Sequence, residues 1–195
     1  QTMPALALRG LTVYPKMMVH FDVGREASVK AIEESMSSNQ PIFLVAQKDI
    51  RVEEPDRNHL FAMGTVSVVR QILRLPGKTI RVMVEGRQRA HLRRLWQTEP
   101  FLQANVEAIP EEPSSEAMRK SPRTEALLRQ TYALFGEYAE QASGVPEEVV
   151  ATVMDSRDPG FLADYIAQNI SLRYTDKQEI LEEFSPYIRL RKLNG

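Results

Sequence analysis

The chain has 195 residues, of which 43% are hydrophobic and 26% are charged, and its formal net charge is −1. This composition is typical of one or two globular domains with real cores and excludes a disordered tail. No apolar run approaches the roughly 18 residues of a membrane-spanning helix, and the first residues lack the pattern of a secretory signal. The absence of cysteine excludes disulfides and thiolate metal sites. We expect a cytoplasmic protein.

The first half of the chain, residues 1–109, has a net basic balance and the pattern of a β-rich domain. One helix is expected from Glu26 to Met36, because apolar residues recur there at helical spacing. The continuous apolar run Ile42–Ala46 is typical of a central strand. Apolar and other residues alternate from Leu102 to Ala108, which predicts a strand with one buried face.

A hairpin is expected in the middle of this half. Gly64 opens a β-rich stretch that continues through Leu75, and Ile80, Val82 and Val84 alternate with more polar neighbours. The intervening Pro76–Lys78 has turn chemistry, because proline fixes φ and glycine permits a positive φ. Several strands at short spacing predict a small barrel or sandwich.

The hydrophobic period changes from two to 3.6 after residues 110–122, which we interpret as a linker. Residues 123–195 then form a predicted helical domain with an acidic balance. Asp158 followed by Pro159 predicts a capped helix start. Thr175–Gln178 matches a capping box, and Pro186 predicts the start of the last helix because proline is disfavoured inside one. The predicted fold class is therefore α+β.

Catalytic chemistry is not indicated. Gly77-Lys78-Thr79 resembles the end of a phosphate-binding loop, but Ile72 stands where the first glycine is required, and the context is a turn between strands. The three histidines lack metal-ligand spacing. We expect no catalytic residue, no cofactor and no metal.

Eight basic residues and one acid lie between Arg70 and Arg94, with Trp96 close behind. This run could form a nucleic-acid face. The alternative is that the arginines are outward residues of half-exposed strands that pair with acidic neighbours elsewhere. We favour the alternative because the charge of the whole chain is close to zero.

Several segments in both halves resemble the opening of bacterial Lon proteases, and their order and spacing cover essentially the whole chain. The clearest of these segments are Pro4–Gly10, Val13–Pro15, Val23–Ser28, Leu44–Lys48, Leu75–Thr79, Val82–Ala90, Asp158–Pro159 and Lys177–Glu182.

The resemblance implies a PUA-like β-barrel or sandwich subdomain with one helix, followed by an α-helical bundle. It also implies a region that captures unfolded or damaged proteins and helps to organise a ring of Lon subunits. The ATPase and the serine protease would lie further along the polypeptide, so this chain itself would be no enzyme. The alternative is a free-standing Lon-domain protein that binds a peptide, a small ligand or RNA.

The candidate substrate-binding residues are Tyr14, Pro15, Met17 and Met18. They form a short apolar segment with two adjacent methionines, and adjacent residues in an extended segment face opposite ways. We therefore expect at least one methionine to be partly exposed. Methionine is flexible and polarizable, which suits the recognition of many apolar sequences. The alternative is that both methionines close one end of the barrel.

Overall fold

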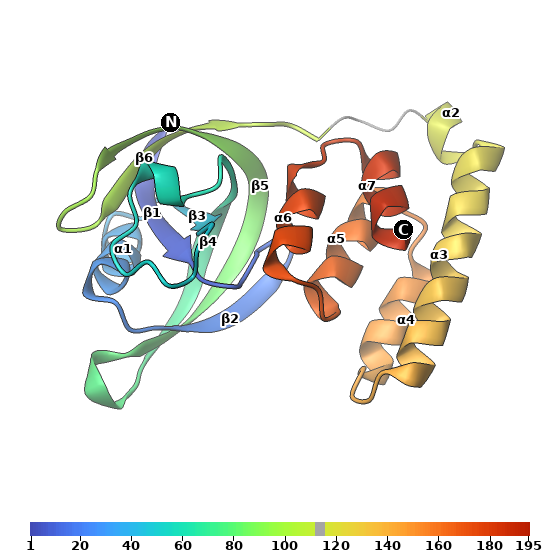
Figure 1. Cartoon of the computed structure of the whole chain (residues 1–195), viewed down its shortest axis with the longest axis horizontal. Coiled ribbons are helices and arrows are strands. Elements are labelled where there is room, and N and C mark those ends of the chain that lie inside the picture. Colours follow the sequence, from blue (N-terminus) through green and yellow to red (C-terminus); the bar gives the residue numbers. More distant parts are fainter. Residues whose placement is uncertain (112–115) are drawn as a thin grey trace. The chain divides into compact units, whose positions relative to one another are not determined.

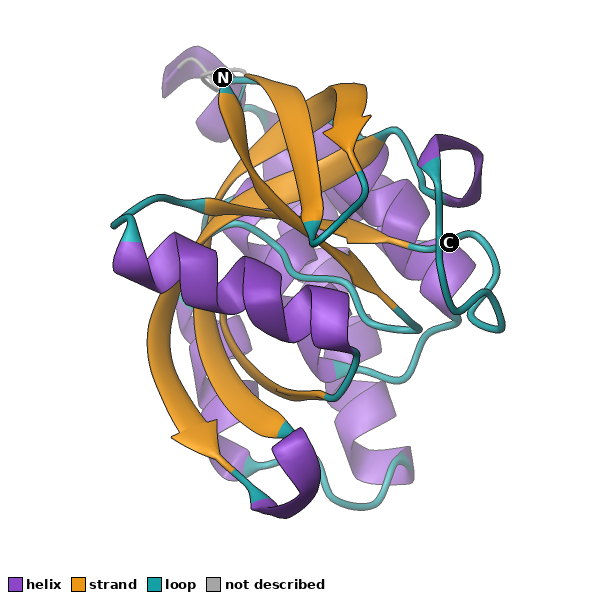
Figure 2. Cartoon of the chain, turned by 90° about the vertical axis from the view of Figure 1, so that its left-hand side faces the viewer, coloured by secondary structure: helices purple, strands orange, loops and turns teal. Residues whose placement is uncertain are grey.

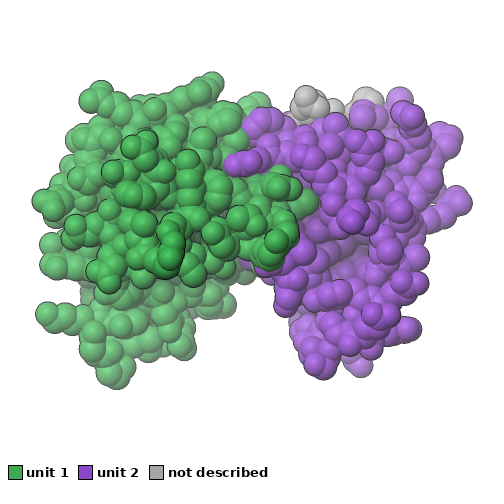
Figure 3. Space-filling model, in the orientation of Figure 1, with its two compact units in different colours: residues 1–110, 173–181 green, residues 111–172, 182–195 purple. Residues whose placement is uncertain are grey.

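The computed structural model describes residues 1–111 and 116–195. These residues form two compact units, one comprising Gln1–Pro110 with Arg173–Leu181 and the other Glu111–Leu172 with Glu182–Gly195 (Figure 3). The predicted linker 110–122 includes residues 112–115, which lie outside the described part of the chain. The predicted helical domain 123–195 is divided between the two units, because residues 173–181 belong to the first.

Six strands make up the sheet of the first unit (Figure 1). Five of them close a barrel in the order β5-β4-β3-β1-β6, because β5 pairs with both β4 and β6. The remaining strand, β2, pairs with residues 80–85 of β5, whereas β6 pairs with residues 90–97. The strands are β1 (Thr2–Leu8), β2 (Met18–Val23), β3 (Ile42–Ala46), β4 (Met63–Arg74), β5 (Ile80–Gln97) and β6 (Leu102–Ala108).

The predicted hairpin is confirmed. Strands β4 and β5 pair in an antiparallel manner and are joined through Pro76–Lys78, where Gly77 has a φ of 79°. The predicted helix is also present as α1 (Glu26–Ser37), which packs against β1 and is seen across the front of the barrel in Figure 2. Its buried stripe includes Ala31 and Ile32, which join the barrel core. The predicted α+β class is confirmed.

Helix α6 (Tyr174–Glu182) packs with the barrel although its sequence lies among the helices of the second unit. The Gln178 side chain donates to the carbonyl of Met63 over 2.9 Å, and the buried Arg89 donates to the carbonyl of Leu181 over 2.7 Å. The predicted capping box is wrong, because the helix begins at Tyr174 and Gln178 serves this distant contact.

The second unit is entirely helical in its described part. Its helices are α2 (Glu116–Arg119), α3 (Pro122–Gln141), α4 (Glu147–Asp155), α5 (Pro159–Asn169) and α7 (Pro186–Asn194). The predicted caps are confirmed: Asp158 accepts hydrogen bonds from the first amides of α5, and α7 begins at Pro186. Leu128, Phe135 and Leu190 lie in its core.

A buried charge lies within this helical unit. The Arg189 side chain is fully buried, and its Nε lies 3.1 Å from Oδ1 of Asp164, which is also buried. The same guanidinium pairs with Glu111 and donates to the carbonyl of Glu183 over 2.9 Å. Charge pairing of this kind offsets the desolvation that burial imposes on both ions.

Candidate functional site

The segment that precedes β2 is fixed to the centre of β5. The amide of Lys16 donates to the carbonyl of Gly86 over 2.8 Å, and the amide of Gly86 donates to the carbonyl of Met17 over 2.9 Å. Lys16 has a φ of 68°, so the chain turns sharply there. A side chain at Gly86 would start 2.1 Å from the carbonyl oxygen of Tyr14. The close approach of the two backbones therefore requires glycine at this position.

The four predicted site residues lie in different environments. Tyr14 and Met17 are buried, and the Tyr14 hydroxyl donates to the carbonyl of Lys177 in α6 over 2.8 Å. Pro15 is half-buried, whereas the side chain of Met18 is 50% exposed. The structure therefore divides the segment into two anchors and an exposed residue at the start of β2.

Met18 belongs to the outer face of the sheet, which we define by Met18, His20, Met83 and Leu73. Residues paired directly across antiparallel strands share a face, and His20 of β2 pairs with Met83 of β5. Met83 in turn pairs with Gln71 of β4. Leu73 follows Gln71 by two residues and therefore lies on the same face of the sheet. The opposite face carries Val82 and Val84, which are fully buried. The apolar side chains thus follow a diagonal across three strands.

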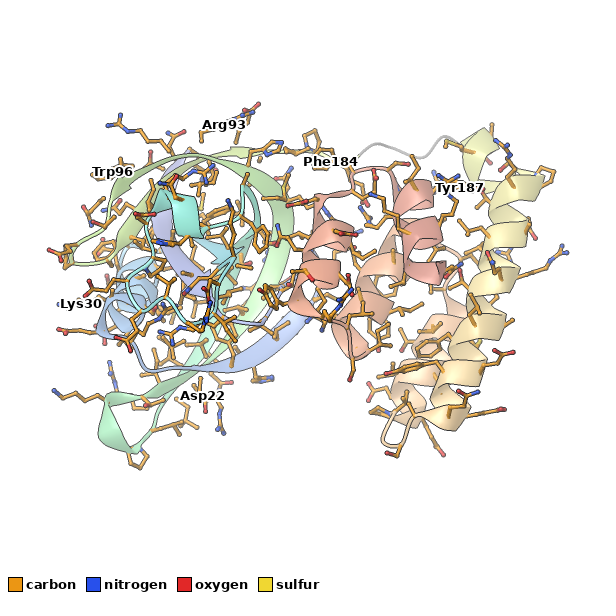
Figure 4. All side chains as sticks on the ribbon, in the orientation of Figure 1. Asp22, Lys30, Arg93, Trp96, Phe184 and Tyr187 are labelled. Carbon is orange, nitrogen blue, oxygen red and sulfur yellow. The ribbon has the colours of Figure 1, made fainter. Side chains whose placement is uncertain are left out.

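Two ion pairs flank this diagonal. Nε of Arg70 donates to a carboxylate oxygen of Glu85 over 2.8 Å, and Nε of Arg81 donates to Asp22 over 2.8 Å. Asp22 is labelled on β2 in Figure 4. The hydrogen bond from Arg70 lowers the pKa of Glu85, and the hydrogen bond from Arg81 lowers the pKa of Asp22. Both carboxylates therefore stay charged at neutral pH, and the apolar diagonal has a charged border.

The alternating sequence pattern already indicates that Met83 faces outward. In the alternating run 80–85, Met83 occupies a position where the neighbouring outward residues are Arg81 and Glu85. An apolar side chain among outward polar ones marks an exposed apolar surface. Leu73 carried no comparable signal, because its strand partner is defined only by the register of β4 and β5.

The basic run between Arg70 and Arg94 is largely paired. Its acid-paired members, with their partners, are Arg70 and Arg87 with Glu85, Arg74 with Glu33, Arg81 with Asp22, and Arg93 with Glu107. The expectation that all these residues face outward is wrong for Arg89, which is buried and bound to α6. An irregularity in the β4–β5 register near Arg87 shifts the alternation by one residue, so Arg89 faces inward.

Within residues 1–111 and 116–195, no helix is long and apolar enough to cross a membrane. The same ranges contain no group of three or more histidine, cysteine or acidic side chains placed to hold a metal ion.

The barrel and the helical unit define an α+β domain, and the apolar diagonal lies on the outer face of its sheet. The ATP-dependent protease La (LON) substrate-binding domain family matches residues 2–195. The chain belongs to this family, as its resemblance to the opening of bacterial Lon proteases implied.

Relatives and solved structures agree with this assignment. The chain is 40% identical over its full length to a Lon protease of Desulforamulus reducens and 39% identical over 99% of its length to Lon protease 1 of Bacillus subtilis. It spans 24% of the length of each. The fold matches the N-terminal domain of a Mycobacterium avium complex Lon protease with a TM-score of 0.74 and 21% identity, over 99% of this chain and 96% of that one.

Proposed function

We propose that this chain is the substrate-recognition and assembly module of an ATP-dependent serine protease and that it binds unfolded or damaged proteins. The apolar diagonal of Met18, Met83 and Leu73, in which Met18 and Leu73 are exposed and Met83 is half-buried, is the observation that carries this proposal. Unfolded chains differ from folded ones in displaying apolar side chains, and flexible methionines adapt to many such sequences. The family to which the chain belongs supports the same function.

The predicted site residues contribute in two ways under this proposal. Met18 contacts the substrate, and the half-buried Pro15 borders the contact. Tyr14 and Met17 are buried and hold the segment in place through α6 and Gly86. Under this division Met17 would close one end of the barrel, as the alternative for the two methionines expects, and recognition is assigned to Met18.

We further propose that the chain has no catalytic activity of its own and that other Lon subunits are its partners in the full-length protein. The turn that contains Gly77 and Lys78 joins two strands, whereas a phosphate-binding loop leads from a strand into a helix. The purified chain should therefore hydrolyse neither ATP nor casein. Turnover of either substrate that survives the change Lys78→Ala and the removal of contaminants would contradict this proposal. Function in the cytoplasm also remains our proposal.

The binding proposal is tested with the double variant Met18→Ser, Met83→Ser. Fluorescence anisotropy with a labelled, chemically denatured protein should give a dissociation constant about tenfold higher, which is about 1.4 kcal/mol. The matched control is Met36→Ser on α1, because Met36 is 46% exposed but lies away from this face. Unchanged affinity in the double variant, with an unchanged melting temperature, would refute the proposed surface.

A further inference from the structure

A hollow of about 1030 Å³ opens on the first unit beside the start of α1, and it is separate from the outer face. Its apolar floor includes Ala5 and Ala7 of β1 and Leu102 of β6. Ligand pockets commonly measure about 300–1,000 Å³, so this hollow has room for several residues of a peptide. Because the side chains of these alanines are small, they do not fill the hollow.

One end of the hollow presents unused hydrogen-bond donors. Arg25 occupies the N-cap position of α1 and makes no side-chain cap, and the first bond inside the helix runs from the amide of Val29 to the carbonyl of Arg25. The amides of residues 26–28 precede that bond and have no partner within the helix. The residues of this first turn line the hollow.

Ser28 contributes a hydroxyl group to the same end of the hollow. Its side chain is 9% exposed and lines the hollow. A serine hydroxyl can donate to a carboxylate oxygen, so it adds one donor to those of the first turn.

Two arginines contribute positive charge at the same end. Arg25 donates to the Gln47 side chain over 2.7 Å and to the carbonyls of Ala7 and Glu53 over 2.6 and 3.2 Å. These acceptors are neutral, and among the described residues neither Arg25 nor Arg9 has a carboxylate at ion-pair distance. Desolvation and the nearby Arg9 lower the pKa of Arg25 to about 10, so a bound anion would stabilise this charge.

Acidic side chains also lie on the rim of the hollow. Glu53, Glu54 and Glu99 line it, while Glu26 is paired with Lys30 over 3.1 Å and Asp56 with His59 over 3.0 Å. Lys30 is labelled on α1 in Figure 4. A free anion would be repelled by this rim. A ligand with a negative end and a positive group some residues away would satisfy both regions.

We propose that this hollow binds the carboxyl terminus of a polypeptide, with the terminal carboxylate at Arg9, Arg25, Ser28 and the first turn of α1. The acidic rim then faces lysine or arginine side chains that precede the terminus. This inference rests on the proposed function, because it names a class of substrate that carries a free carboxyl end. It adds a second contact, which recognises the end of a chain, whereas the outer face recognises apolar side chains.

The test compares two labelled peptides that are rich in glycine, serine and lysine and lack large apolar residues. One ends in a free carboxylate. The other has an amidated end and a glutamate in place of its last residue, but is otherwise identical, so both peptides carry the same net charge. Anisotropy with the full chain should show about tenfold tighter binding of the free acid, because a charge-assisted hydrogen bond is lost in the amide. Equal affinities would overturn the proposal, since the site would then recognise negative charge of any kind or none.

Two variants test whether the preference for the free carboxylate arises in the hollow. The double variant Arg9→Gln, Ser28→Ala should abolish it, because both side chains line the end of the hollow that would hold the carboxylate. Arg94→Gln, a change to another exposed arginine of the barrel, should retain it. A preference that survives in the double variant would place the carboxylate elsewhere and refute the site. Binding of denatured, amidated protein depends on the outer face and should be unaffected, so failure of either proposal is recognised separately.

Discussion

The carbonyl oxygen of Tyr14 occupies the space that a side chain at Gly86 would need. A Cβ atom at residue 86 would lie 2.1 Å from that oxygen and 2.9 Å from the carbonyl carbon. Both atoms belong to the backbone, so neither can move aside without breaking the hydrogen bonds of Lys16 and Met17 with Gly86. The conformation of the segment that leads to Met18 therefore depends on the absence of a side chain at Gly86.

Gly86→Ala should destabilise the first unit by about 1–3 kcal/mol, the range of a substitution that forces atoms into filled space. The measurement is the unfolding midpoint in urea. Gly24→Ala is the matched control, because its Cβ would meet only Thr79 Oγ1 at an ordinary 3.7 Å. Equal midpoints for the two variants would show that the two backbones separate readily.

The two adjacent methionines should respond differently to the same change. Met17 is 5% exposed, and replacing a buried methionine with a small residue costs about 2–5 kcal/mol. Met18 is 50% exposed, so Met18→Ser should change stability by less than about 0.5 kcal/mol, as surface substitutions usually do. Thermal unfolding measures both, and a larger loss for Met18→Ser than for Met17→Ser would contradict the assignment of the two roles.

Arg189→Met should strongly destabilise the helical unit. The change leaves the buried carboxylate of Asp164 without its ion-pair partner, and removing one member of a buried pair costs about 3–5 kcal/mol. Arg191→Met serves as the control, because Arg191 is exposed on the same helix. Urea unfolding followed by circular dichroism checks the difference, and similar midpoints for the two variants would count against the buried pair.

The ion pair beside the outer face should lower the pH at which the Glu85 carboxyl group titrates. The pKa of Glu85 is lowered from 4.5 chiefly by the hydrogen bond from Arg70. The pair therefore stabilises the fold above that pH, and this stabilisation is lost as the pH falls through the pKa of the folded state. Carboxyl chemical shifts in a pH titration should give a midpoint below 4.5. Arg70→Gln should move the midpoint upward and Arg94→Gln should not. A wild-type midpoint at or above 4.5 would show that the pair does not form.

Local patterns in the sequence predicted the elements whose contacts are near in the chain. The alternation around Val82 and Val84, with turn chemistry at Pro76–Lys78, was sufficient for the hairpin. The cap at Asp158 needed only its own following amides. In each case the residues that determine the structure lie within a few positions of one another.

Local sequence patterns did not predict contacts between residues that are far apart in the chain. Gln178 fits a capping box by spacing, but its side chain binds the carbonyl of Met63, which is 115 residues away in sequence. Arg89 fits the outward pattern until the irregular register near Arg87 is known. For the same reason, the sequence predicted only part of the candidate site. Met18 lies near Met83 only because of the β2–β5 register, which no local pattern reveals.

The most direct test of the proposed function is a titration that follows the methyl groups of the eight methionines by NMR while a denatured, amidated polypeptide is added. The proposed surface predicts that the signals of Met18 and Met83 shift or broaden first, because these side chains lie on the outer face. The exposed Met36, Met118 and Met154 serve as internal controls and should change little. Equal changes at all exposed methionines, or changes confined to the three controls, would contradict recognition by this face.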